Sequence, residues 1–101
     1  SKIAPYFCTV FPLVKNKPDL VKKAKEVYKE LKSCYSCFYD DAGSVGRRYA
    51  RADEVGTPYC ITVDFESLDD DSVTIRDRDT MKQERIKISE LKDKLFSNYL
   101  S

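Results

Sequence analysis

Apolar residues recur along this chain with two periods, one typical of buried strands and the other typical of helices. Residues 6–14 are apolar on both alternating faces, which predicts a strand in the middle of a sheet. Asn16-Lys17-Pro18 marks the start of a helix, because proline is favoured at the first helical position. An apolar stripe at helical spacing follows, made of Leu20, Val21, Ala24, Val27, Tyr28 and Leu31.

The same two periods predict four more strands and two more helices. The strands are expected at residues 34–39, 59–66, 72–78 and 83–88. Ser44 is expected to cap a helix that runs to about Glu54 and stops at Gly56-Thr57-Pro58. Ser89 is expected to cap the last helix, whose inward positions are Leu91, Leu95 and Tyr99.

This order of elements, β-α-β-α-β-β-β-α, predicts an α/β protein with three layers, α/β/α. The two crossover helices require the first three strands to be parallel. The short Asp69-Asp70-Asp71 turn makes the fourth strand antiparallel to the third. The expected fold is therefore a five-stranded mixed sheet with strand 4 antiparallel and three helices. A chain of 101 residues is long enough for one such domain, at 1–101.

Composition excludes several classes of function. The chain has no His, so Ser-His-Asp and Cys-His catalysis and His-metal sites are excluded. Its apolar runs are too short for a membrane-spanning helix, and no leader pattern is present, so we expect no membrane association. Because the chain also begins without Met, we interpret it as a fragment of a longer protein.

A net charge of +1 conceals an uneven distribution of charge. Residues 1–39 carry eight Lys and three acids, whereas residues 40–80 carry five Arg, no Lys and eleven acids. The planar guanidinium of Arg holds bidentate geometry that Lys does not. Arg among carboxylates therefore fits either ligand recognition or fixed ion pairs.

The predicted hairpin of the third and fourth strands carries the most informative polar residues. Asp64 and Glu66 are expected to share one polar face with Arg76 and Arg78, near the strand ends. Cross-strand ion pairing on an exposed face is one interpretation. The other is recognition of a flat polar ligand such as cytosine, which offers an amino donor to a carboxylate and acceptor atoms to Arg.

The segment 43–48 opens the second helix just beyond a strand end. Free N–H groups at a helix start, with Arg47 beside them, suit a phosphate. Gly43-x-x-Gly46 has the spacing of a KH-domain loop, but here a strand precedes it, which disfavours that class. Asp40-Asp41 and Asp64 also invite a Mg²⁺ or phospho-acceptor interpretation, which the absence of an acid after the first strand disfavours.

Four cysteines invite a zinc interpretation that the predicted strand disfavours. Cys34 and Cys37 have zinc-ligand spacing, but Cys8 and Cys60 are single. In a strand, a three-residue offset places Cys34 and Cys37 on opposite faces. We therefore expect no metal site, no Cys34–Cys37 disulfide, and reduced, mostly buried thiols.

Three stretches of the chain resemble one family. Ala4-Pro5-Tyr6 leading into Val10-Phe11-Pro12-Leu13 resembles the first strand of the anticodon-binding domain of class II aminoacyl-tRNA synthetases. The run from Gly43 to Pro58 resembles the glycyl-tRNA synthetase version, of the eukaryotic and archaeal type. So does Val63-Asp-Phe-Glu with the later run from Val73 to Met81. The resemblance covers nearly the whole chain and implies the mixed sheet expected above.

The resemblance also implies a parent enzyme, glycine–tRNA ligase. The parent has a separate catalytic domain, which we expect to be absent from this chain. That domain uses ATP and Mg²⁺ to attach glycine to tRNA(Gly), whereas the present domain needs no cofactor and reads the anticodon stem-loop. The parent is expected to be a cytoplasmic homodimer, with a mitochondrial form possible, and the isolated domain a monomer without catalytic activity. A non-catalytic scaffold, such as the accessory domain of mitochondrial DNA polymerase, is the alternative.

By the same resemblance, the anticodon site lies on strands 3 and 4 and at the loop after strand 2. The implied contacts are Glu66, Arg76 and Arg78 on the strands and Asp41 and Ser44 at the loop. Arg47 joins them from its place at the helix start, and Asp64 from its chemistry. A structural network is expected for Arg48, Arg51, Asp53 and Glu54. The lysines of the first helix fit a solvated face or a contact with the tRNA backbone.

Overall fold

The fold was analysed in a computed structural model, which describes residues 7–99. Five strands form one sheet: β1 (Cys8–Pro12), β2 (Cys37–Tyr39), β3 (Tyr59–Val63), β4 (Ser72–Asp77) and β5 (Gln83–Lys87). Four helices accompany it: α1 (Pro18–Lys32), α2 (Val45–Glu54), α3 (Phe65–Asp70) and α4 (Ile88–Tyr99). The predicted strand at 6–14 is thus shorter than expected, and the predicted strand at 34–39 is reduced to its last three residues.

The sheet has the order β2-β1-β3-β4-β5. Strand β1 is parallel to both β2 and β3, while β4 is antiparallel to β3 and β5. This confirms the predicted mixed sheet with strand 4 antiparallel. The parallel strands all end at the same side of the sheet, which we call the carboxyl edge and define by the residues that follow Pro12, Tyr39 and Val63.

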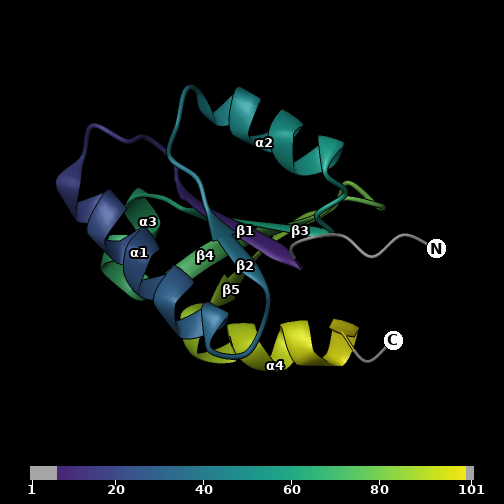
Figure 1. Cartoon of the computed structure of the whole chain (residues 1–101). Coiled ribbons are helices and arrows are strands. Elements are labelled where there is room, and N and C mark those ends of the chain that lie inside the picture. The colour runs from purple at the N-terminus through teal and green to yellow at the C-terminus, as the bar shows by residue number, and fades with distance from the viewer. Residues whose placement is uncertain (1–6, 100–101) are drawn as a thin grey trace.

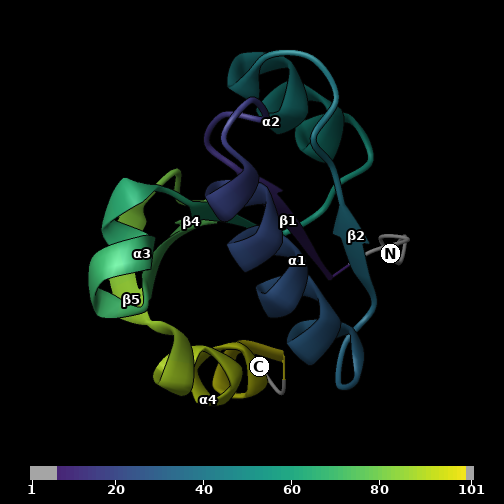
Figure 2. The same ribbon diagram turned by 90° about the vertical axis from the view of Figure 1, so that its left-hand side faces the viewer.

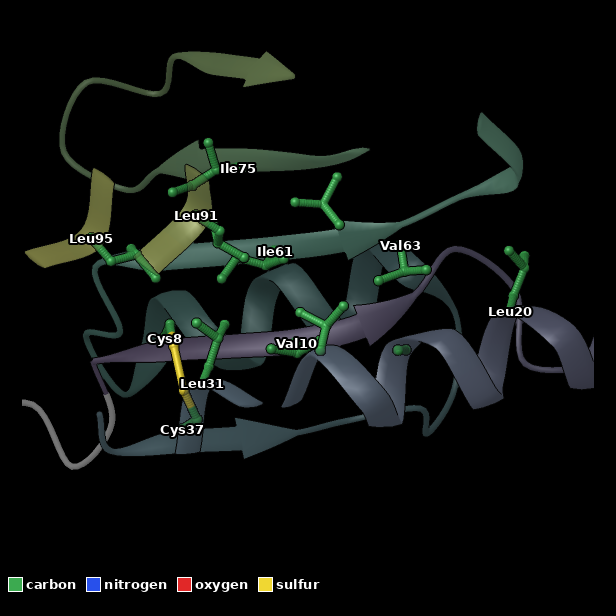
Figure 3. Close-up of a cluster of buried hydrophobic side chains, with 13 residues drawn as sticks. Cys8, Val10, Leu20, Leu31, Cys37, Ile61, Val63, Ile75, Leu91 and Leu95 are labelled. Carbon is green, nitrogen blue, oxygen red and sulfur yellow. A yellow bond between two sulfur atoms is a disulfide. The ribbon is translucent and has the colours of Figure 1, made fainter. Parts of the chain in front are cut away.

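Helices cover both faces of the sheet and so make the three predicted layers (Figures 1 and 2). Helix α2 lies on one face, and α1 and α4 lie on the other. The larger core lies between the sheet and the α1–α4 layer, where the inward side chains of α1 and α4 meet those of β1 and β3 (Figure 3). A smaller cluster of Phe11, Ala52 and Cys60 lies beneath α2.

The third strand ends three residues earlier than predicted, because a helix begins there. Asp64 caps α3: its side chain accepts the N–H of Ser67, and the Ser67 hydroxyl accepts the N–H of Asp64. This capping box offers the backbone more local hydrogen bonds than an extended strand would. Asp71, with φ 53°, then ends the helix. The protein thus has four helices rather than three, and 69–71 is not a simple hairpin turn.

The prediction of reduced thiols is wrong for two of the four cysteines. Cys8 and Cys37 lie directly opposite each other on neighbouring strands, with their Cα atoms 5.0 Å apart, and form a disulfide (Figure 3). Cys34 is an exposed free thiol outside the strand, and Cys60 is a buried free thiol. The Cα separation that closes a disulfide depends on the register between strands, which the sequence pattern does not reveal.

Two predictions lie outside the described residues, namely the inward side chain of Tyr99 and the Ala4-Pro5-Tyr6 part of the resemblance. Across the described part of the chain, no helix combines the length and the apolar character needed to cross a membrane.

Candidate nucleic-acid interface

The carboxyl edge gathers five of the seven predicted site residues. Two connections at this edge supply polar side chains: the loop between β2 and α2, and the junction of β3 with α3. The five residues are Asp41, Ser44, Arg47, Asp64 and Glu66. Ligands of open α/β sheets bind at this kind of edge, because the loops that follow parallel strands converge there.

The loop that follows β2 is held rigidly by one arginine. Arg51 donates to both carboxylate oxygens of buried Asp40, at 2.9 and 3.0 Å, and to the carbonyl of Ala42 at 2.6 Å. Asp40 also accepts the N–H of Ala42 at 3.0 Å. Burial acts to raise the pKa of Asp40, but these hydrogen bonds and the charge of Arg51 outweigh it, so the pKa is lowered.

A second arginine ties the same loop to the end of β1. Arg48 is 2% exposed, although it carries a charge. Its guanidinium donates to the carbonyls of Pro12 and, at 3.1 Å, Gly43, and it lies 5.7 Å from the centre of the Phe11 ring. The structural role predicted for Arg48 and Arg51 is confirmed. Glu54, in contrast, is exposed and forms no ion pair with any residue in 7–99.

The start of α2 presents an unpaired guanidinium, and the loop before it carries the Asp41 carboxylate. The Arg47 side chain is exposed, and within residues 7–99 it forms no ion pair or hydrogen bond, although its backbone N–H donates to the capping hydroxyl of Ser44 at 3.3 Å. Asp41 accepts a hydrogen bond from Tyr39 at 3.2 Å. Burial together with the Asp41 carboxylate raises the pKa of Tyr39, which keeps that phenol a donor.

The junction of β3 and α3 is organised by Arg85, a residue that the sequence reasoning did not select. Arg85 lies on β5, opposite Thr74 of β4. Its guanidinium donates to Asp64 and to Ser72, the latter at 2.5 Å, and its Nε lies 3.7 Å from the Glu66 carboxylate. The register of β5 against β4 would have indicated this partner, but sequence spacing alone does not supply that register.

Arg76 and Arg78 do not join the cluster to which they were assigned. Arg76 lies opposite Cys60, four residues and about 13 Å from Asp64 along the sheet. It packs 4.9 Å from the centre of the Tyr49 ring, beneath α2, and 3.7 Å from Asp53. Arg78 is at the opposite edge, where its N–H donates to Pro58. Because β4 is antiparallel, its higher-numbered residues lie farther from the carboxyl edge.

Glu66 and its neighbour Phe65 are both exposed at the edge. Glu66 keeps 70% of its side chain exposed despite its contact with Arg85, so its second oxygen is accessible to a ligand. Phe65 is 51% exposed as the first residue of α3. An exposed ring next to the Glu66 carboxylate, which the Arg85 guanidinium contacts, suits an unpaired base, because unpaired bases stack on aromatic rings and are read by polar groups.

No group of three or more His, Cys, Asp or Glu residues in the described part of the chain has the geometry of a metal site. Of the two cysteines with zinc-ligand spacing, Cys37 is bonded to Cys8 and Cys34 is a free thiol.

Comparison with known proteins gives one family. The chain matches the anticodon binding domain family over residues 8–98. A glycine–tRNA ligase of Clostridium kluyveri is 58% identical over 91 residues, which make up 90% of this chain and 19% of that protein. The glycine–tRNA ligases of Borreliella afzelii and Rhodopirellula baltica are 51% and 57% identical over 90 residues, which are 89% of this chain and 20% and 17% of those proteins. The chain spans about a fifth of the length of these relatives.

Solved structures show the same architecture. The prolyl-tRNA synthetase of Cryptosporidium parvum superposes with a TM-score of 0.83 and 26% identity over 93% of this chain and 20% of its own. The RNA binding domain of the threonyl-tRNA synthetase from the same organism superposes with a TM-score of 0.81 over 92% of this chain and 23% of its own. At 24% identity the second likeness concerns the fold alone.

Proposed function

This chain belongs to the anticodon binding domain family, and we propose on that basis that it is the tRNA-reading part of a glycine–tRNA ligase. The observation that carries the proposal is the match of 58% identity to a glycine–tRNA ligase along 90% of the chain. The exposed carboxylate, guanidinium groups and aromatic ring at the carboxyl edge support it, because they are the groups that read unpaired bases.

The rest of the reaction belongs to the parent enzyme. ATP and Mg²⁺ act in a separate catalytic part, which joins glycine to tRNA(Gly), and the domain described here needs neither. The parent is a cytoplasmic homodimer and the isolated domain a monomer. Glycine-dependent pyrophosphate exchange by the purified 101-residue chain would contradict this division of labour.

Glycine codons have the form GGN, so every glycine anticodon carries cytosine at its second and third positions. A glycine-specific domain therefore reads two cytosines and tolerates the first anticodon base. Each cytosine needs an acceptor for its amino group and donors for its ring nitrogen and carbonyl oxygen. Glu66 with Arg85 supplies one such combination, and Asp41 with Arg47 supplies the other, at the two junctions of the carboxyl edge.

We leave Arg76 and Arg78 out of this readout, because the first lies beneath α2 and the second at the opposite edge of the sheet. Ser44 and Asp64 contribute by position, because each caps the helix that carries a reading residue. The two caps hold Arg47 and Glu66 in place before RNA binds, which lowers the entropy cost of binding.

The proposal is tested by titrating the chain with tRNA(Gly) and with the same tRNA in which one anticodon cytosine is replaced. The unchanged chain is expected to prefer tRNA(Gly) by about 1–3 kcal/mol per cytosine, the usual value of one good base contact. Glu66→Ala is expected to weaken binding of tRNA(Gly) by a similar amount. The loss shrinks on the tRNA that already lacks the matching cytosine.

Glu54→Ala is the matched control, because Glu54 is an exposed glutamate at the other end of α2 with no ion pair among the described residues. This variant is expected to bind both tRNAs like the unchanged chain. Equal losses for Glu66→Ala on every tRNA, or no loss on any, would show that the Glu66 carboxylate does not read a base.

A further inference from the structure

Helix α1 carries lysines along one side of its solvent-facing surface. Four of them recur at spacings of three and four residues, which places them in one row: Lys22, Lys25, Lys29 and Lys32. Lys15, in the loop after β1, extends the row toward the carboxyl edge. We call these five residues the basic face. On the other side of the helix, Glu30 of α1 lies near Lys92 of α4.

The charge of the basic face is not neutralised within the described structure. On the other side of α1, Lys23 pairs with Asp71 and Glu30 lies 4.0 Å from Lys92. No carboxylate in residues 7–99 comes within ion-pair distance of any lysine of the basic face. Glu26 of α1 lies beside these lysines, in a shallow hollow that Lys22, Lys25 and Lys29 also line, but it forms no ion pair within residues 7–99. The four lysines on α1 form a row about 15 Å long from Lys22 to Lys32, and Lys15 lies before the helix begins. None of the five is held in an ion pair within residues 7–99.

The ammonium groups of two of these lysines lie over aromatic rings. Lys25 Nζ lies 5.8 Å from the centre of the Tyr39 ring, and Lys32 Nζ lies 5.3 Å from the centre of the Tyr28 ring. Such contacts hold an ammonium group near the surface while leaving its N–H donors directed to solvent. Lys22 and Lys29 line a shallow hollow with Val21 and Pro18.

We propose that the basic face of α1 binds the phosphate backbone of the RNA whose anticodon lies at the carboxyl edge. The inference rests on the proposed function for the identity of the RNA. Helix α1 starts at the carboxyl edge, directly after β1, and leads away from it along the sheet. Lysine is a flexible point charge that suits phosphate rather than the edge of a base. The basic face thus contributes affinity and orientation, and the carboxyl edge contributes specificity.

The test compares two triple variants that remove the same charge. Lys22→Gln, Lys25→Gln and Lys29→Gln together remove three charges from the basic face. Lys82→Gln, Lys92→Gln and Lys94→Gln remove three from outside it, at the start of β5 and on α4. Gln and Lys have similar helix propensities, so both variants are expected to fold, which circular dichroism checks.

The probes are two synthetic RNA hairpins, one with the glycine anticodon and one with both anticodon cytosines replaced. Binding to the 101-residue chain is measured by fluorescence anisotropy between about 50 and 300 mM salt. Loss of three phosphate contacts is expected to reduce the slope of log K against log salt by about 2–3 and to weaken binding on the order of 100-fold at 0.1 M salt. Both hairpins lose affinity by the same factor, and the control variant loses much less.

A loss no larger than that of the control overturns the inference, as does a loss confined to the hairpin with the glycine anticodon. Failure of the unchanged chain to bind either hairpin at the lowest salt also overturns it. A different result would contradict the proposed function, namely equal binding of the two hairpins by the unchanged chain. In that case a salt-dependent loss in the Lys22, Lys25 and Lys29 variant still identifies the basic face as a site for an RNA backbone.

Discussion

Consecutive arginines of α2 have opposite roles, because each residue of a helix is turned by about 100° from the one before it. Arg48 points into the protein and donates to the carbonyls of Pro12 and Gly43. Arg47 points outward at the carboxyl edge and has no side-chain partner among the described residues. The sequence analysis assigned Arg48 to a structural network, which its burial and hydrogen bonds confirm, whereas the contact of Arg47 with RNA is part of the proposed function.

Arg48→Met keeps most of the side-chain volume but leaves two backbone carbonyls without their donor. We expect the free energy of unfolding to fall by about 1–3 kcal/mol, the cost of an unsatisfied buried polar group. Arg47→Met is the matched control and is expected to change stability by less than about 0.5 kcal/mol. Urea denaturation measures both variants, and equal stabilities would contradict the assignment of Arg48 to the fold.

The Asp40–Arg51 pair gives the stability of the protein a defined dependence on pH. Because the folded-state pKa of Asp40 is below its usual value near 3.8, the ionised carboxylate stabilises the fold above that value. This contribution is lost as the pH falls through the lowered pKa. Asp40→Asn keeps an acceptor for the N–H of Ala42 but has no charge for Arg51.

The difference in stability between the unchanged chain and Asp40→Asn is therefore expected to be largest near neutral pH and to shrink below about pH 4. Thermal unfolding across this range measures it. Asp69→Asn, at an exposed position with no ion pair among the described residues, serves as the control and is expected to show no such trend. A constant difference down to pH 2 would contradict the role given to the carboxylate charge.

At the scale of elements, the short helix α3 depends on its first residue. Asp64 both caps the helix and pairs with Arg85 of β5, and so it joins α3 to the far side of the sheet. An isolated helix of six residues is not stable in water, so α3 exists through its cap and its tertiary contacts. The position of Glu66 at the carboxyl edge depends on these same contacts.

Two substitutions separate the roles of Asp64. Asp64→Ala removes the cap and the ion pair and is expected to lower the free energy of unfolding by about 1–2 kcal/mol. Asp64→Asn keeps the cap and loses only the charge, so its expected cost is under about 1 kcal/mol. Chemical denaturation compares them, and equal costs would mean that the charge pair with Arg85, not the cap, holds α3.

At the scale of the whole molecule, the four cysteines differ in exposure and bonding according to their places in the fold. Cys34 is exposed, Cys60 is buried, and Cys8 and Cys37 are joined across β1 and β2. Burial raises the pKa of the Cys60 thiol to about 11, so little of the reactive thiolate is present at neutral pH.

The oxidised chain is therefore expected to react with one equivalent of maleimide when native, two when unfolded without reductant and four after reduction. Mass spectrometry of the labelled peptides identifies the cysteine at each step. Labelling of Cys8 or Cys37 in the unfolded, unreduced chain would contradict the disulfide. Rapid labelling of native Cys60 would contradict its burial beneath α2.

The sequence pattern determined the layers and the sheet of this protein. The spacing of apolar residues separates strands from helices, and short connections limit how neighbouring elements can be arranged. The apolar stripe of α1 and the cap at Ser44 appear where they were predicted. The parallel direction of the first three strands followed from the two crossover helices that connect them. Family membership also followed from the sequence, since the run from Gly43 to Pro58 is distinctive.

Tertiary structure alone decided which charges meet. Alternation predicted that Arg76 would join Asp64, but Arg85 of β5 takes that place, because the antiparallel course of β4 carries Arg76 away from the carboxyl edge. The Asp64 cap starts a helix at Phe65 and leaves that side chain exposed. It forms because local hydrogen bonds compete with the strand, which the spacing of apolar residues does not reveal. Strand register and side-chain burial are properties of the folded chain, and they determine which of the predicted residues are available to RNA.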